Sequence, residues 1–302
     1  MELYQLRSFV AVAEAGHLTR AAVKLHLSQP AVSGHIKALE DELEMALFKR
    51  TSSGMDLTFF GQRLLADAEK VLAAAQTLRS DASALKGEVA GKVSVGTLSD
   101  PEFIRIGEFL GTMVERHPLM QLELHHEISG AAFAKVREGQ LDASFYFGAL
   151  AHPGVDGLRL RGITYRVAAP AAWKNRMVDA DWSAIASLPW IITPPISTHN
   201  QLVRALFDKH RIEPTKVVEA DQESVIANSV VSGVGLSLIR EELALVREAL
   251  GEVCLWSDVR LETDLWFIYG VARKGDPVVR AMLAVLADTW KVGMEASTQM
   301  AR

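Results

Sequence analysis

The chain has 302 residues, of which 49% are hydrophobic and 23% are charged, and its formal net charge at pH 7 is −5. This length and composition predict a globular protein of about two domains, each with a sizeable core. The net charge gives no overall indication of a nucleic-acid partner, so recognition of such a partner would depend on the local placement of charges.

No segment has the composition of a signal peptide or a membrane span. The first thirty residues carry five charged side chains and no long apolar run, and no later window approaches about 18 uninterrupted apolar residues. The one cysteine, Cys254, excludes an internal disulfide, and its apolar neighbours indicate a buried strand. We therefore expect a cytoplasmic protein in which Cys254 has no redox role.

The first ninety residues have the pattern of helices. Apolar residues at spacings of three and four across residues 3–13 predict a first helix that ends at Gly16. Thr19 is expected to cap a short second helix that ends at Leu25. Ser28 is expected to cap a third helix, in whose first turn Pro30 is tolerated because its missing N–H would be unpaired there in any case.

The third helix has a buried stripe and a polar first turn. In the stretch AAVKLHLSQPAVSGHIKALEDEL, residues 21–43, the apolar stripe is formed by Val32, Ile36, Leu39 and Leu43. At about 100° per residue, Gln29, Ser33 and Lys37 project away from that stripe. Two short helices joined by a tight turn form a helix-turn-helix, although a small helical bundle fits the spacing equally well.

The segment after the third helix favours the helix-turn-helix. LFKRTSSGMDLT, residues 47–58, has the pattern of a two-stranded wing, which would place Lys49 and Arg50 beside DNA phosphates. Residues 1–63 contain seven basic and seven acidic residues, so binding would rely on local charge and on the partial positive charge of the helix N-terminus. Four acidic residues lie at the far end of the third helix, in residues 40–44.

Residues 1–63 resemble the winged helix-turn-helix of the LysR-type transcriptional regulators, a bacterial family. The pattern AA..L..SQPAVS..I..LE..L...LF.R, followed by LTFFGQRLL, carries the resemblance. It implies a sequence-specific DNA-binding transcriptional regulator in which Ser28, Gln29, Pro30 and Ser33 approach base edges and Arg50 approaches a phosphate. The full set of candidate DNA-contacting residues is Thr19, Arg20, Ser28, Gln29, Pro30, Ser33, Lys37 and Arg50.

Three residues depart from the family pattern. Gly34 stands where a longer polar side chain is usual, His35 follows it, and His17 replaces a small hydroxyl residue before the second helix. Glycine within a helix costs about 1 kcal/mol relative to alanine, so Gly34 reflects either a close approach to DNA or drift. Thr19 is expected to substitute as the cap of the second helix.

Residues 59–86 contain no proline and predict one helix of about 42 Å, capped by Thr58. Spacings of four and three run through it and predict a heptad seam that pairs with the same helix of a second chain. The alternative is that this seam packs onto the C-terminal part of the same chain. The seam residues are Leu64, Ala68, Val71, Ala75, Leu78, Ala82 and Leu85.

Residues 91–302 alternate strands and helices, which predicts an α/β domain with a mostly parallel sheet. The layout resembles the effector domain of the same family, which is built from two lobes like a periplasmic binding protein. The predicted organisation is a DNA-binding domain (1–58), a linker helix and hinge (59–90) and an effector-binding domain (91–302). Its first lobe would span about 91–161 and 267–302, and its second lobe about 162–266.

Ligands bind where strand ends face the cleft between two such lobes. Hydroxyl-bearing residues lie at several predicted strand ends, where free helix N–H groups suit an anion. By resemblance to the family, the inducer pocket is lined by Thr97, Ser99, Ser129, Phe147, Thr193, Ser197, Thr198 and His199. Each hydroxyl alone could equally be a helix cap. A small carboxylate is the family's default effector, although Phe145 and Phe147 could instead form an apolar pocket.

Other motifs predict no further chemistry. His125 and His126 are neighbours on a strand and point to opposite faces, so they are not expected to share a metal with Glu127. GVGLSL from Gly233 lacks the third glycine of a phosphate loop and predicts a tight turn. No nucleophile, base and orienting acid form a recognisable set, so we expect neither an enzyme nor a cofactor.

These features predict a regulator that binds promoter DNA as a homodimer or homotetramer, responds to a small molecule and contacts RNA polymerase. One alternative is an enzyme or small-molecule-binding protein that uses the two-lobed domain, with the helical N-terminus serving only oligomerisation. A third possibility is a sensor that acts through a protein partner without any DNA preference.

Overall fold

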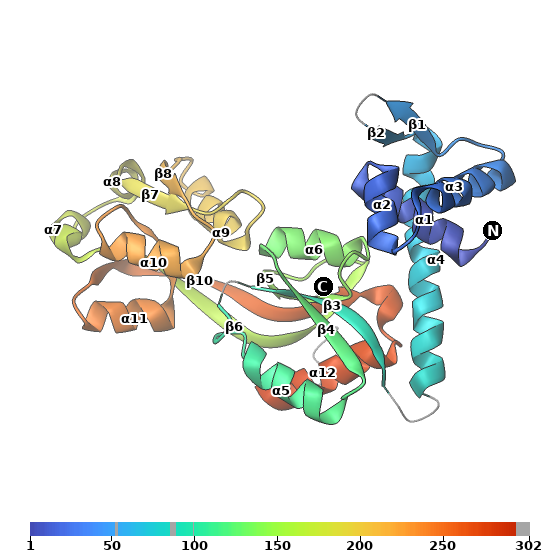
Figure 1. Cartoon of the computed structure of the whole chain (residues 1–302). Coiled ribbons are helices and arrows are strands. Elements are labelled where there is room, and N and C mark those ends of the chain that lie inside the picture. Colours follow the sequence, from blue (N-terminus) through green and yellow to red (C-terminus); the bar gives the residue numbers. More distant parts are fainter. Residues whose placement is uncertain (52–53, 85–88, 99, 294–302) are drawn as a thin grey trace. The chain divides into compact units, whose positions relative to one another are not determined.

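A computed structural model describes residues 1–51, 54–84, 89–98 and 100–293 of the chain. Contacts divide the chain into two compact units, Met1–Lys86 and Gly87–Arg302 (Figure 1). In the part that the structure describes, no helix combines the length and the apolarity that a bilayer crossing requires.

The N-terminal unit is a helical domain with a two-stranded wing. Its elements are α1 (Leu3–Ala15), α2 (Leu18–Leu25), α3 (Gln29–Leu43), β1 (Phe48–Thr51), β2 (Gly54–Leu57) and α4 (Phe59–Ala84). Strands β1 and β2 pair antiparallel, as the sequence predicts. The stripe of α3 packs with Phe9 and Val12 of α1 and with Leu47 before the wing, in a core of fully buried side chains. Burial of this stripe fixes the orientation of α3 and leaves its polar face outward.

The predicted ends of the first three helices are confirmed except for the cap of the second helix. Gly16 ends α1 in a left-handed conformation with φ +67°, and Ser28 caps α3 by accepting a hydrogen bond from the Ala31 N–H at 3.3 Å. The N-cap of α2 is His17, which makes no side-chain capping bond, and Thr19 lies inside the helix. The chain turns directly after Gly16, so that Leu18 begins α2 and packs against the core.

The predicted seam of α4 is divided between two environments. Ala68 is buried and Leu64 half-buried against the core of the same N-terminal unit, where α1 contacts α4. Farther along the helix, Val71 and Leu78 are 40% and 70% exposed. Ala75 is half-buried, Ala82 is exposed, and Leu85 lies outside the described residues. Thr58 caps the helix by accepting a hydrogen bond from the Gly61 N–H at 3.0 Å, as predicted.

The C-terminal unit contains a six-stranded sheet in the order β4-β3-β5-β10-β6-β9. The strands are β3 (Gly91–Thr97), β4 (Met120–His126), β5 (Ala143–Phe147), β6 (Val155–Pro170), β9 (Ser237–Arg240) and β10 (Val253–Gly270). Only the β3–β4 and β3–β5 pairs are parallel, so the expected mostly parallel sheet is wrong. The reason is that β6 and β10 run in opposite directions along each other for most of their length.

The strands β6 and β10 connect two lobes of the C-terminal unit. In the first lobe, α5 (Ile106–Arg116) and α12 (Pro277–Trp290) pack together on one face of the sheet, and α6 (Ser129–Arg137) lies on the other (Figure 1). Successive side chains of β10 point to opposite faces of the sheet. Phe267 therefore packs in the core with α5 and α12, and Ile268 packs in the core with α6. The chain forms turns over residues 101–105, directly before α5.

The second lobe surrounds the far ends of β6 and β10. A parallel pair, β7 (Pro189–Ile192) and β8 (Thr215–Glu219), is joined to the chain before β9 by a bridge between Trp190 and Leu236. Its helices are α7 (Lys174–Met177), α8 (Trp182–Ser187), α9 (Thr198–Asp208), α10 (Glu223–Val231) and α11 (Glu241–Ala249). Predicted site residues meet near the lobe boundary, where β5 ends, where β7 leads into α9 and where α6 begins.

Candidate functional site

The first turn of α3 is on the surface of the N-terminal unit. Ser28, Gln29 and Pro30 are exposed, and Lys37 is exposed two turns further along. Ser33 is half-buried between them. Because the apolar stripe of α3 is turned into the core, this row is the side of α3 that can enter a groove of DNA.

Exposed basic side chains lie on α2 and β1, the elements before and after α3 in the chain. Lys49 and Arg50 are exposed on β1, and Arg20 is exposed near the start of α2, beside the equally exposed Thr19. Glu40 has a role that sequence reasoning missed: its carboxylate accepts hydrogen bonds from the Leu47 and Phe48 N–H groups at 2.7 and 3.1 Å. It thereby holds the start of the wing against the end of α3.

Of the two unusual residues Gly34 and His35, only His35 has a structural explanation within the N-terminal unit. The His35 ring is hydrogen-bonded through Nδ1 to the Ser8 hydroxyl at 2.8 Å and lies 4.6 Å from the Tyr4 ring, so it joins α3 to α1. Gly34 is exposed, and a Cβ there would have no neighbour within 4 Å. Nothing within the N-terminal unit requires glycine at this position.

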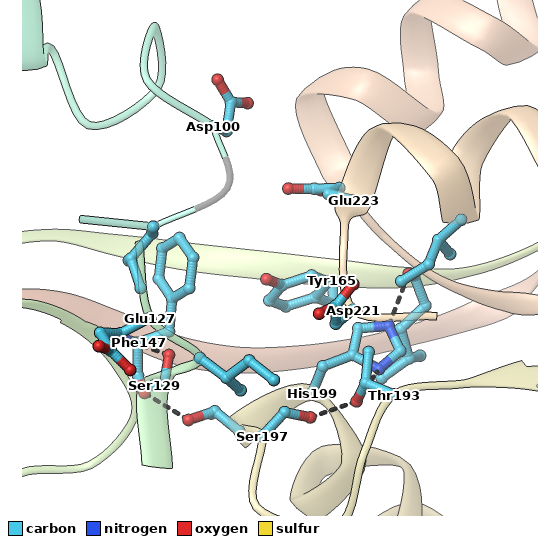
Figure 2. A pocket seen from close by; sticks show the side chains of 15 residues that line it. Asp100, Glu127, Ser129, Phe147, Tyr165, Thr193, Ser197, His199, Asp221 and Glu223 are labelled. Carbon is cyan, nitrogen blue, oxygen red and sulfur yellow. Dashed lines mark hydrogen bonds between the residues drawn. The ribbon is translucent and has the colours of Figure 1, made fainter. Parts of the chain in front are cut away.

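A pocket of about 620 Å³, open to solvent, lies between the two lobes of the C-terminal unit (Figure 2). Six of the eight predicted effector-binding residues line it: Ser129, Phe147, Thr193, Ser197, Thr198 and His199. Thr97 is not brought to it, since its hydroxyl donates to the backbone oxygen of His125 at 3.3 Å. Ser99 lies outside the described residues. Phe145 is fully buried in the core and does not form the pocket.

Sequence reasoning missed most of the ionisable side chains of the pocket. The structure adds Tyr165 from β6 and four acidic residues, Asp100, Glu127, Asp221 and Glu223. The sequence suggests no effector-binding role for Glu127, which directly follows the two histidines at the end of β4. Asp221 and Glu223 lie just before and at the start of α10, a position that follows a strand as the other candidates do.

The second-lobe wall of the pocket is a connected set of hydrogen bonds. Ser197 caps α9 by accepting from the Asn200 N–H at 3.1 Å, and its hydroxyl also meets that of Thr193. His199 Nε2 donates to the backbone oxygen of Leu238 at 2.9 Å, and its Nδ1 lies 3.4 Å from the Thr193 hydroxyl. Burial lowers the pKa of His199 to about 4, although its bond to Leu238 opposes this, so the imidazole is neutral at pH 7.

Two contacts join the lobes across the pocket. The Thr198 hydroxyl donates to the backbone oxygen of Phe147. Arg240, 6% exposed, donates from Nε to both carboxylate oxygens of Glu223 at 2.8 and 2.7 Å and from a second nitrogen to Asp100. Burial raises the pKa of Glu223, and the Arg240 guanidinium opposes that effect. Arg240 is therefore a cation that links Asp100 of the first lobe to Glu223 of the second.

The described residues contain no group of three or more His, Cys, Asp or Glu side chains arranged to hold a metal ion. The two neighbouring histidines of β4 are both exposed. The chemistry that the pocket offers is therefore that of hydrogen-bonding, charged and aromatic side chains.

Comparison with known proteins gives matches in both units. Residues 3–62 match the family described as bacterial regulatory helix-turn-helix protein, lysR family, and residues 86–291 match the LysR substrate binding domain. The HTH-type transcriptional regulator XapR of Escherichia coli K12 is 24% identical over 286 residues, which cover 94% of this chain and 97% of XapR.

Solved structures show the same similarity over the full length. A full-length OxyR variant from Pseudomonas aeruginosa superimposes with a TM-score of 0.68 at 26% identity, covering 100% of this chain and 99% of OxyR. Full-length CbnR in complex with its target DNA gives a TM-score of 0.58 at 22% identity, covering 96% of this chain and 100% of CbnR. With both of its units matched, this chain belongs to the LysR family of bacterial transcriptional regulators, DNA-binding proteins with an effector-binding domain that are not enzymes.

Proposed function

We propose that the N-terminal unit reads promoter DNA with the first turn of α3 in the major groove. Base edges would be met by Ser28, Gln29, Pro30 and Ser33, and Arg50 of the wing would lie near a phosphate. The exposure of this turn, opposite the buried stripe of α3, supports the assignment. Arg20 and Lys37 would add phosphate contacts from α2 and from the middle of α3.

The pocket of the C-terminal unit is the proposed effector site. Its walls come from both lobes and combine apolar and aromatic side chains with a few converging polar groups, as small-molecule sites do. An effector that contacts both walls would favour one arrangement of the lobes over others. It would then shift the population of regulator states, which is the basis of allosteric control.

Assembly through α4 completes the proposed mechanism. Val71 and Leu78 are apolar and exposed on the described part of this helix, which supports pairing with the same helix of a second chain. A dimer would present two copies of α3 to two DNA half-sites, and two dimers would form a tetramer. In the cytoplasm, changes in the spacing of these half-site contacts would alter access of RNA polymerase to the promoter.

The observation that carries this proposal is the convergence of six predicted effector residues on one pocket in a chain whose other unit exposes the recognition turn. The test is a footprint of the purified protein on the DNA upstream of its own gene. Protection of two symmetric half-sites that changes when metabolites are added is the expected result. Absence of protection even at low salt, where phosphate contacts are strongest, would contradict the proposal.

A further inference from the structure

The pocket lining is acidic. Four of the lining residues carry carboxyl groups, Asp100, Glu127, Asp221 and Glu223, and none of the described lining residues is lysine or arginine. Two cations outside the lining contact some of these groups, because Lys135 pairs with Glu127 and Arg240 pairs with Asp100 and Glu223. A ligand in this space therefore meets carboxylate oxygens on both lobes.

The hydroxyl groups of the second-lobe wall also present lone pairs. Because His199 donates through Nε2, its neutral Nδ1 can only accept, and the Thr193 hydroxyl is the group placed to donate to it. Ser197 must then donate to Thr193, and the Thr198 hydroxyl proton is used by the Phe147 oxygen. These three hydroxyls are left with acceptor capacity toward the pocket. Ser129 and Tyr165 can still donate.

Two aromatic rings lie among these acceptors. Figure 2 shows the rings of Phe147 and Tyr165 at the centre of the pocket, with Asp100 and Glu223 on one side and the Ser and Thr hydroxyls on the other. Aromatic faces attract a cation within about 6 Å of the ring centre. Carboxylates, hydroxyl lone pairs and ring faces share this preference for positive charge.

The pocket offers little to an anion. The N-termini of α6, α9 and α10 lie at it, but Ser197 already caps α9, Glu223 is the first residue of α10, and Glu127 directly precedes the N-cap of α6. Arg240 is buried and pairs with Asp100 and Glu223, so a ligand carboxylate would have to displace one of them. The four carboxyl groups also outnumber the two cations that pair with them, so a ligand carboxylate would add repulsion between like charges.

We propose that the effector of this pocket is a small organic cation with N–H donors, held by Glu127, Asp221 and Glu223 and by the faces of Phe147 and Tyr165. This inference rests on the proposed function of the pocket as the effector site. It replaces the simple carboxylate that the sequence led us to expect with a ligand of opposite charge.

The test uses three aromatic probes of similar size that differ in charge: benzylamine, benzyl alcohol and benzoate. Binding to the full-length protein is measured by isothermal titration calorimetry at two ionic strengths. Benzylamine should bind at least about tenfold more tightly than benzyl alcohol, because one hydrogen bond to a charged group contributes about that factor. Benzoate should bind least, and added salt should weaken only the benzylamine complex.

Neutral variants of single pocket acids provide the second part of the test. Asp221→Asn and Glu127→Gln should each weaken benzylamine binding about tenfold and leave benzyl alcohol binding unchanged. Glu262→Gln removes the same charge from an exposed position on β10 outside the pocket, and it should leave all three affinities unchanged.

Two results would overturn the proposal. One is benzylamine binding no tighter than benzyl alcohol, including the case in which neither binds. The other is an affinity that Asp221→Asn and Glu127→Gln leave at the level of Glu262→Gln. If the footprint upstream of the gene is present and responds to an anionic or neutral metabolite, the regulator function stands and only the cationic effector is rejected.

Discussion

At the scale of single residues, Gln29 and Arg50 should have separable roles in DNA binding. Both side chains are exposed, but Gln29 lies in the first turn of α3 and Arg50 on the wing. Gln29→Ala should reduce discrimination between the footprinted site and scrambled DNA by about 1–3 kcal/mol. Arg50→Ala should weaken binding to both sequences alike and lower the slope of log affinity against log salt by about 1.

Fluorescence anisotropy on both DNA sequences at several salt concentrations measures these effects. Lys209→Ala, which removes an exposed positive charge from the C-terminal unit, is the matched control and should change neither quantity. Equal losses on both sequences for Gln29→Ala would show that the base-reading side of α3 has been wrongly placed.

His199 makes the stability of the C-terminal unit depend on pH. Its pKa is about 4 in the folded chain against an ordinary value of 6.5, because burial disfavours the charged imidazole. The unfolded chain therefore takes up a proton that the folded chain refuses as the pH falls from 6.5 toward 4. The free energy of unfolding should drop over this window by at most roughly 3 kcal/mol from this group, and it should be insensitive to His199 above pH 7.

Tryptophan fluorescence isolates this effect, since all six tryptophans lie in the C-terminal unit, in residues 173–290. Denaturant unfolding at pH 5 and 7 should show a smaller pH difference for His199→Gln than for the unchanged protein. His125→Gln, at an exposed histidine of β4, should keep the full difference. An unchanged difference in His199→Gln would mean that another group controls the acid response.

At the scale of elements, the two lobes pack closely where α6 faces the loop before α9. A Cβ added at Gly130, the second residue of α6, would lie 1.9 Å from the backbone oxygen of Ile196. Gly130→Ala must therefore move one lobe away from the other, and we expect it to cost about 1–3 kcal/mol of stability. The contact between Thr198 and Phe147 lies at the same boundary and should weaken with it.

Gly107 is a matched control, because it is the second residue of α5 and a Cβ there would meet nothing within 4 Å. Gly107→Ala should leave the melting temperature unchanged or raise it slightly, since alanine favours the helix by up to about 1 kcal/mol. Thermal unfolding and effector titration of both variants provide the comparison. Similar melting temperatures would show that the lobes can separate at Gly130 without loss.

The elements that the sequence predicted well are those set by local patterns. The helix-turn-helix, the wing and the strand cores follow from periodicity, caps and turn residues. Apart from the apolar neighbours of Cys254, the first halves of β6 and β10 have no strand pattern in the sequence, because charged residues such as Arg159, Arg161 and Glu262 interrupt the apolar alternation. The antiparallel course of these strands depends on how the two lobes are connected, which no local pattern records.

In the pocket too, local patterns predict some of the lining residues and miss those that only the tertiary fold brings together. Its hydroxyl residues could be predicted, since serine and threonine at strand ends and helix starts have a recognisable position. Its carboxylates could not, because Asp100 and Glu223 come together only through Arg240, more than a hundred residues from Asp100. Charge in a cleft is a property of the tertiary fold, and it is this property that changes the expected effector from an anion to a cation.

At the scale of the whole molecule, the proposed assembly would use the part of α4 that its own unit leaves uncovered. Val71 and Leu78 are exposed, whereas Ala68 is already buried within the N-terminal unit. Pairing of α4 with a second copy would bury the exposed parts of both side chains, and this burial contributes about 1–2 kcal/mol for each. The double variant Val71→Asp with Leu78→Asp should therefore dissociate the dimer without unfolding either unit.

Sedimentation velocity of the full chain measures the assembly, and the footprint measures its consequence. The double variant should sediment as a monomer and lose protection of the two half-sites, because a single α3 binds one half-site with far lower affinity than a linked pair. Ala66→Asp places a charge on an exposed position roughly 120–140° around the helix from both residues and should leave assembly intact. A double variant that remains dimeric would assign the contact between chains to another surface, and it would separate DNA recognition from the pairing of α4.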